Sequence, residues 1–104
     1  MNNSIQVFSN IEFGTVRVLE INGEPWFVGK DVAEVLRYRD TADAIKRHVD
    51  DEDKLTRCFT DSGQSREMYI INESGLYSLI LSSKLPNAKK FKKWVTGEVL
   101  PSTL

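Results

Sequence analysis

The sequence predicts an α+β fold in which a small, mostly antiparallel sheet of about five strands packs against about four helices. Three observations support this. Residues 16–21 alternate apolar and polar side chains, as a half-buried strand does, and Asn22-Gly23 after them is a strong hairpin turn. Residues 88–99 repeat apolar side chains at helical spacing. At 104 residues, the chain is long enough for one domain (1–104, ordered core 5–101) with its own core.

Five segments are expected to form the sheet. Pro25 suits the start of the third one, where a missing N–H matters least. Trp26 and Phe27 then point to opposite faces, one into the core and the other over an edge. A loop over residues 61–65 joins the last two, with Gly63 available for a left-handed conformation. The segments are 5–8, 16–21, 24–28, 54–60 and 66–71.

The first predicted helix follows Gly29, which lets the chain turn after the third strand. Its apolar stripe is Val32, Val35 and Leu36. Asp31 with Glu34 three residues later fits a capping box, or else Asp31 simply occupies a first turn that favours negative charge.

Asp40 or Thr41 is expected to cap the second helix, with Ala42, Ile45 and Val49 on its inner side. The two helices invite a helix-turn-helix interpretation, although no glycine lies in the turn; the alternative is a plain helical hairpin covering the sheet. The hairpin that follows then resembles a wing, from which Arg57 and Arg66 reach a DNA backbone.

Asn72 is a good N-cap for the third helix, and Ile71 with Leu76 fits a hydrophobic staple. Gly75 permits close packing at the start of this helix. Pro86 suits the first turn of the fourth helix, and Pro101 ends it. One side of the fourth helix is apolar: Ala88, Phe91, Trp94, Val95 and Val99.

The predicted core combines the inward positions of these elements. Its members are Val18, Phe27, Val32, Leu36, Ile45, Leu55, Ile70, Leu76, Leu79, Ile80, Phe91, Trp94 and Val95.

Charge is distributed unevenly along the chain. The net charge is −1, yet the residues from Lys84 onward carry +4 and those before it carry −5. Such a chain can offer one basic face, and any DNA binding should be modest and salt-sensitive. The acidic run 50–53 is expected to be a solvated loop turned away from phosphates; it lacks the glycine and alternating ligands of a calcium loop.

The residues that catalysis usually needs are missing, so we expect no enzyme, cofactor or metal. His48 is the only histidine, and a surface or capping role suits its place late in a helix. Cys58 is the only cysteine, which rules out an intramolecular disulfide and suits a reducing cytoplasm. No apolar run is long enough to cross a membrane, and the N-terminus does not resemble a signal peptide.

Two motifs carry a family resemblance. Residues 72–77, the 82–84 connection, 88–95 and 98–101 are similar to the end of the BRO family N-terminal domain, and residues 26–36 resemble its first strand-to-helix segment. That domain occurs in baculovirus BRO proteins and phage antirepressors. The resemblance implies DNA binding by a phage or prophage transcription regulator in the bacterial host cytoplasm. Family proteins usually continue into a second domain, so this chain is expected to be an excised domain or a short stand-alone member.

Phosphate contacts are expected from exposed cations on helix faces. The first candidates are Lys89, Lys90, Lys92 and Lys93, followed by Lys46, Arg47, Arg37 and Arg39. A rival hypothesis is a protein-binding domain that contacts a repressor, which the near-neutral charge favours. An exposed apolar patch beyond the core would distinguish the two. The sequence leaves the oligomeric state open, a dimer included.

Overall fold

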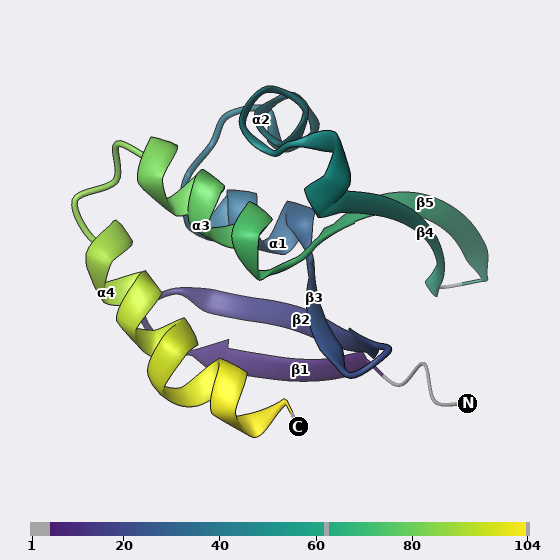
Figure 1. Ribbon diagram of the computed structural model, residues 1–104, viewed down its shortest axis with the longest axis horizontal. Helices are drawn as coiled ribbons and strands as arrows, with labels where there is room; N and C mark the ends of the chain where they lie inside the picture. The colour runs from purple at the N-terminus through teal and green to yellow at the C-terminus, as the bar shows by residue number, and fades with distance from the viewer. Residues whose placement is uncertain (1–4, 62, 104) are drawn as a thin grey trace.

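The computed structural model describes residues 5–61 and 63–103, which form one five-stranded antiparallel sheet with four α-helices (Figure 1). The strand order is β1-β2-β3-β5-β4. The α+β fold class is therefore confirmed. The strands are β1 (Ile5–Asn10), β2 (Gly14–Ile21), β3 (Glu24–Val28), β4 (Lys54–Asp61) and β5 (Gln64–Ile71).

The sheet consists of two locally paired parts. Strands β1, β2 and β3 form a meander whose second turn has positive φ at Asn22 (53°) and Gly23 (79°), as predicted. Strands β4 and β5 form a hairpin that pairs from Asp61–Gln64 onward, so its turn is shorter than the expected loop 61–65. Gly63 has the expected left-handed φ of 80°, while Ser62 lies outside the described residues.

The two parts meet at a short seam. Strand β3 pairs with β5 only through Phe27–Ile71 and Val28–Ile70. All four side chains are fully buried. Beyond this seam the β4–β5 hairpin leaves the line of the meander, as Figure 1 shows at its right-hand side.

Four helices pack with the sheet: α1 (Gly29–Val35), α2 (Thr41–His48), α3 (Glu73–Ser82) and α4 (Ala88–Trp94). Helix α4 begins after Asn87, so Pro86 precedes it and the prediction that Pro86 lies in its first turn is wrong. The helical path continues through a π turn (Val95–Val99) into a 3₁₀ turn (Leu100–Ser102) that contains Pro101. The helix thus extends one residue beyond its predicted end.

The main core lies between the helices and one face of the sheet. Helix α4 and the π turn after it pack their apolar side against the meander. Phe91 of α4 is fully buried, and so are Val95 and Val99 of the π turn. The predicted core is confirmed except at Leu55, which is 44% exposed: it lies on an edge strand and pairs with Ile70, so it faces away from the main core. Ala42 is also exposed; Ala44 takes the inward place on α2 instead.

A smaller cluster occupies the other face of the sheet. It contains Leu19, Trp26, Val28, Phe59 and Ile70. Trp26 and Phe27 therefore point to opposite faces, as expected, and each is buried in a different cluster. No helix contributes to the buried residues of this second cluster, which the β4–β5 hairpin covers instead.

Two glycines allow elements to approach closely. A Cβ on Gly75 would lie 3.0 Å from Val49 Cγ1 and 3.1 Å from Ile71 Cβ, which confirms the predicted close packing. A Cβ on Gly29 would lie 2.6 Å from Ile45 Cδ1. Gly29 has no positive φ, so packing against α2, rather than a turn, explains this glycine.

Side-chain caps define the helix starts. Asn72 Oδ1 accepts from the Gly75 N–H at 2.9 Å, and Asp40 Oδ1 accepts from the Asp43 N–H at 3.0 Å, as expected for both. Helix α1 has no side-chain cap, so the capping-box alternative for Asp31 is wrong and the first-turn alternative is right.

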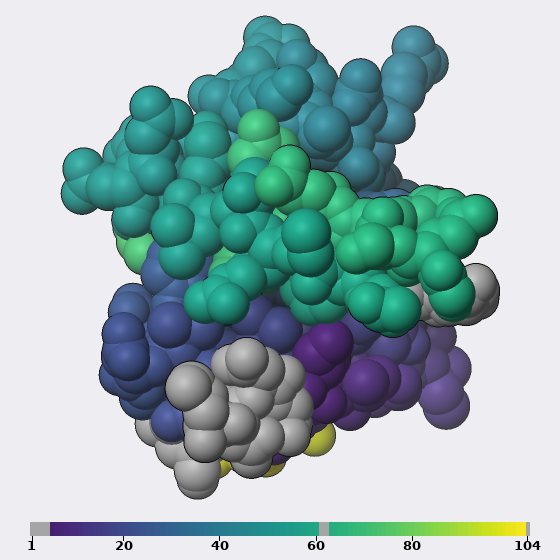
Figure 2. Space-filling model, turned by 90° about the vertical axis from the view of Figure 1, so that its right-hand side faces the viewer, coloured from purple at the N-terminus to yellow at the C-terminus, as the bar shows by residue number. Residues whose placement is uncertain are grey.

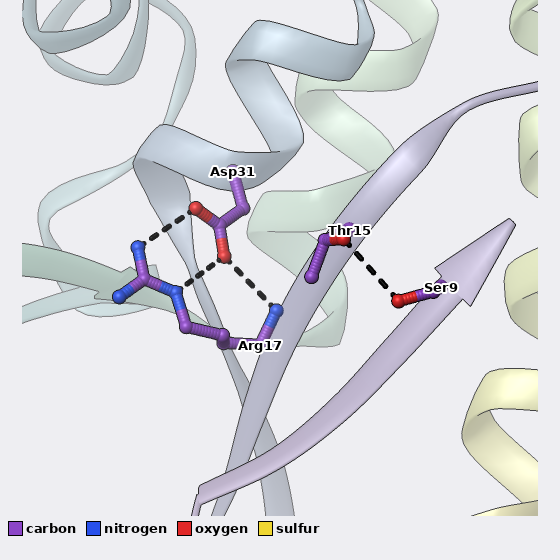
Figure 3. Close-up of polar contacts among 4 residues, drawn as sticks. All are labelled: Ser9, Thr15, Arg17 and Asp31. Atoms are coloured by element: carbon purple, nitrogen blue, oxygen red, sulfur yellow. Dashed lines mark hydrogen bonds and ion pairs between the residues drawn. The ribbon is translucent and has the colours of Figure 1, made fainter.

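Asp31 joins α1 to strand β2. Its carboxylate accepts from Arg17 Nε at 2.8 Å, from Arg17 Nη2 at 2.9 Å and from the Arg17 backbone N–H at 3.0 Å (Figure 3). Nearby, Ser9 and Thr15 hydroxyls lie 3.2 Å apart across β1 and β2 (Figure 3). Asp31 is only 7% exposed, and this fork fixes α1 over the sheet.

Candidate nucleic-acid interface

A hollow of about 600 Å³ lies where the end of α1, the end of α2 and the α3–α4 connection meet. Four arginine or lysine side chains line it, and no described residue that lines it carries a carboxylate. We call this hollow the basic groove. Its residues are Leu36, Arg37, Tyr38, Arg39, Arg47, His48, Ser82, Lys84, Leu85 and Pro86.

The end of α1 is an unusual helix C-cap. The Tyr38 N–H donates to the Ala33 carbonyl and the Arg37 N–H to the Glu34 carbonyl, both at 3.0 Å. This is the Schellman pattern, whose left-handed residue is normally glycine. Here that residue is Arg37, with φ 64°. The sequence has no glycine in this turn, and Arg37 takes the left-handed position that glycine usually occupies. Its side chain therefore lines the groove.

Changing Arg37 to Gly is expected to raise the free energy of unfolding by about 1 kcal/mol, because glycine adopts the left-handed conformation without the steric penalty that a Cβ imposes. Urea denaturation measures the change. Arg39→Gly is the control, since Arg39 has no positive φ and the same substitution there should not stabilise. A less stable Arg37→Gly variant would contradict the argument.

Tyr38 forms part of the groove wall and is held in place. Its hydroxyl donates to the Leu79 carbonyl at 2.7 Å, and its ring centroid lies 5.7 Å from that of His48. Burial raises the pKa of the Tyr38 hydroxyl, which therefore stays protonated as a donor. The α1–α2 turn is consequently anchored to α3.

The opposite wall is also fixed by hydrogen bonds. Ser83 Oγ donates to the Leu36 carbonyl at 3.5 Å, and the Leu85 N–H donates to Ser83 Oγ at 3.1 Å. These contacts place Lys84 beside the end of α1. The groove is therefore preformed by contacts between its lining residues and their neighbours Leu79 and Ser83.

The eight predicted site residues fall into separate groups. Arg37, Arg39 and Arg47 line the basic groove. Lys46 is exposed on α2 but does not line it. The other four, which we call the α4 lysine face, are exposed on a helix that contributes no residue to the groove: Lys89, Lys90, Lys92 and Lys93.

One member of the α4 lysine face has a defined contact. Lys92 Nζ lies 6.0 Å from the centroid of the Tyr77 ring. The Tyr77 hydroxyl donates to Glu73 Oε2 at 2.8 Å, and burial together with this carboxylate raises the pKa of Tyr77 to about 12. Lys92 is thus positioned over α3, while its neighbours project from α4.

Seven of the ten groove residues are not among the predicted site residues, and three of them carry ionisable side chains: Lys84, His48 and Tyr38. Lys84 had been counted only in the basic C-terminal stretch, and His48 was assigned to the surface or a cap. Tyr38 was placed in a loop. Their sequence neighbours give no signal of a shared site, because residues 82–86 join the groove from more than thirty positions beyond His48.

Among the described residues, acidic groups do not line the groove itself, but a neighbouring hollow that shares Arg37 and Leu85 is lined by Glu12, Asp31 and Glu34. Arg47 pairs with Asp43 at 3.5 Å, but both side chains are mostly exposed, and such surface pairs contribute little. The acidic run lies elsewhere. The prediction that residues 50–53 form a solvated loop is wrong for the last of them. Asp53 is only 9% exposed, and its Oδ1 accepts a hydrogen bond from Asn72 Nδ2 at 3.1 Å.

The structure does not decide the helix-turn-helix hypothesis, which stays a prediction. The alternative, a helical hairpin that covers the sheet, holds for its first helix: α1 packs on β2, β3 and β5, whereas α2 packs on α1 and α3. The outer face of α2 carries Lys46 and Arg47.

Within residues 5–61 and 63–103, no helix is long and apolar enough to span a membrane, and no cluster of three or more potential metal ligands occurs.

Comparison with known proteins places this architecture in a family. Residues 15–101 match the family model described as BRO family, N-terminal domain. A protein of Invertebrate iridescent virus 6, named for a Bro-N domain, is 42% identical over 97 residues; the match covers 75% of this chain and 23% of that protein. An uncharacterized protein of Haemophilus influenzae is 38% identical over 104 residues, covering 97% of this chain and 51% of that protein.

A third relative is the uncharacterized Bro-N domain-containing protein L2 of Acanthamoeba polyphaga mimivirus, 32% identical over 117 residues and covering 100% of this chain and 48% of that protein. The chain thus spans about half or less of the length of these relatives. No solved structure matches it. Because the family model matches most of the chain, the protein belongs to the BRO family and carries its N-terminal domain.

Proposed function

We propose that this domain binds DNA through the basic groove. The observation that supports the proposal is the convergence of four permanent or near-permanent cations, from three separate segments, around one hollow that no described carboxylate lines. The cations are Arg37, Arg39, Arg47 and Lys84. Such an arrangement attracts phosphate oxygens, and displacement of counterions from DNA supplies the driving force.

The chemistry of the groove suits a nucleic-acid backbone. Guanidinium groups present paired N–H donors that match phosphate geometry, and lysine adds a point charge. The surface pair between Arg47 and Asp43 is weak enough for a phosphate to replace the carboxylate. Contacts of this kind position the protein without reading sequence.

The α4 lysine face supplies a second, more exposed set of cations. We assign it an auxiliary role, because its lysines lie along one helix face and do not converge on a hollow. In this proposal the chain is the DNA-binding part of a phage or prophage antirepressor that acts in the cytoplasm of the bacterial host. The relative from Haemophilus influenzae supports a bacterial setting.

Fluorescence anisotropy of labelled duplex and single-stranded DNA across a salt series tests the proposal. Changing Arg39, Arg47 and Lys84 to Ala is expected to weaken binding about a hundredfold at low salt, from roughly 1 kcal/mol per charge-assisted contact. The slope of log affinity against log salt should become shallower by about 0.9 for each duplex phosphate contact removed. Changing all four lysines of the α4 lysine face to Ala removes one more positive charge than the groove variant does. It should nevertheless weaken DNA binding less than the groove variant.

A third variant provides a matched control. Lys30, Arg57 and Arg66 changed to Ala removes the same charge from residues outside the groove, and it should leave most of the DNA affinity. Equal losses in the groove and control variants would show that the groove contributes no more to DNA affinity than Lys30 and the hairpin arginines do, which would refute the groove as the main contact. If the unmodified domain bound neither DNA at low salt, DNA binding by this domain would be refuted altogether.

A further inference from the structure

Exposed apolar side chains remain after the core is assigned, and several gather on the sheet face opposite the helices. Val7 is 61% exposed, Leu55 is 44% exposed and Ile5 is 40% exposed. Residues directly opposite each other in a ladder share a face. Ile5 pairs with Leu19 and Leu55 pairs with Ile70, and both partners belong to the smaller cluster. We call this side of the sheet the open face.

The open face is hollowed where the β4–β5 hairpin lies over the meander. One hollow of about 220 Å³ is lined by Ile5, Leu19, Ile21 and Phe59, among others. An adjoining hollow of about 190 Å³ shares Ile5 and Phe59 and includes Met68. Figure 2 looks onto this side, with the hairpin in teal and green above β1 in purple. Together the two hollows form one cleft with an apolar floor.

Cations surround this cleft. Arg57 lines the first hollow, and Arg17, Lys30 and Arg66 line the second. Arg17 is already paired with Asp31, whereas Lys30 and Arg57 form no ion pair with any residue in the described ranges. Among the described residues that line the cleft, Glu20 is the one carboxylate. The rim is therefore electropositive.

Both edges of the sheet border the cleft. Strand β1 is one edge and contributes Ile5; strand β4 is the other edge and contributes Arg57, Phe59 and Thr60. Each edge strand presents backbone N–H and C=O groups without a ladder partner on its outer side. An extended peptide can pair with such an edge and place alternate side chains on the sheet face.

We propose that the open-face cleft docks an acidic protein segment in extended conformation, with apolar side chains on the Ile5 and Phe59 floor and carboxylates toward Arg57 and Arg66. The apolar floor favours protein over nucleic acid, because phosphates gain nothing from contact with Ile5, Leu19 and Phe59. A second copy of the same face would oppose like charges. This surface is separate from the basic groove and stands whether or not the groove binds DNA.

A synthetic peptide tests the proposal with the whole 104-residue chain. The probe is a short, acetylated, fluorescein-labelled peptide that alternates glutamate and valine, and a peptide with lysine in place of glutamate is its control. The acidic peptide is expected to bind, and Arg57→Glu with Arg66→Glu should weaken it at least about tenfold. Binding should also protect the amides of one edge strand, β1 or β4, from hydrogen exchange.

A second double reversal controls for charge. Lys89→Glu with Lys90→Glu makes the same change on α4, and it should alter peptide affinity by less than about twofold, within the usual effect of a distant surface substitution. Circular dichroism confirms that both variants fold. The proposal is overturned if the acidic peptide does not bind, if both reversals weaken it equally, or if the Arg57 and Arg66 reversal removes DNA binding while leaving peptide binding intact.

Discussion

Changing Phe91 to Ala is expected to lower the free energy of unfolding by about 3–5 kcal/mol. Phe91 is fully buried between α4 and the meander, with its ring centroid 5.5 Å from Phe13 and 6.0 Å from Trp94. Removing the ring loses its transfer free energy and leaves a cavity that two neighbouring aromatic rings cannot readily fill. Equilibrium denaturation in urea measures the loss.

The preceding residue provides the control for this substitution. Lys90 is exposed on the outer face of α4, so Lys90→Ala should change stability by less than about 0.5 kcal/mol. Because alanine is a better helix former than either lysine or phenylalanine, comparable losses in both variants would mean that burial of the Phe91 ring is not what stabilises α4. A loss of less than 1 kcal/mol for Phe91→Ala would show that α4 is not part of the cooperative core, against its position in the structure.

Changing Asp31 to Ala is expected to destabilise the domain by about 2–3 kcal/mol. Breaking a buried pair typically costs about 3–5 kcal/mol, and the value is reduced here because the Arg17 side chain is 31% exposed. The substitution also leaves the Arg17 backbone N–H without the carboxylate that accepts from it at 3.0 Å. Thermal and urea unfolding together determine the change.

Glu34 offers a matched carboxylate on the same helix. It is exposed and forms no ion pair with any described residue, so Glu34→Ala should have an effect below about 0.5 kcal/mol. Asp31→Asn keeps the shape and one acceptor, and it should fall between the two. An Asp31→Ala variant as stable as Glu34→Ala would show that the fork contributes no net stability.

The sequence predicted most elements because their signals are local. Asn22-Gly23 specifies its turn through the φ values that both residues tolerate, and Asn72 caps α3 through a bond three residues away. The predicted burial of Leu55 was wrong because apolar character does not reveal which sheet face a side chain will occupy, and Leu55 lies on the face that the helices do not cover. The capping-box alternative was wrong because the partner of Asp31 is Arg17, on another strand.

The candidate site was only partly predictable for the same physical reason. Charge clustering along the chain pointed to the α4 lysine face, whose members are neighbours in sequence. The basic groove instead depends on how α3 returns beside the α1–α2 turn, through contacts such as the Tyr38 hydroxyl on the Leu79 carbonyl. Arg37, Arg39 and Arg47 were therefore named as candidates, while Lys84 became a neighbour only after folding.

The two-pair seam between β3 and β5 has a consequence for how the domain folds. The meander and the β4–β5 hairpin each close through local turns, which form quickly, whereas the seam requires the chain to close a long loop that contains α1 and α2. Only two residue pairs form across the seam, so their backbone hydrogen bonds offset little of the entropy lost on closing the loop. Most of the stabilising free energy at the seam must come from burial of four apolar side chains: Phe27, Val28, Ile70 and Ile71. We therefore expect the docking of the meander and the hairpin at this seam to be the slow step of folding.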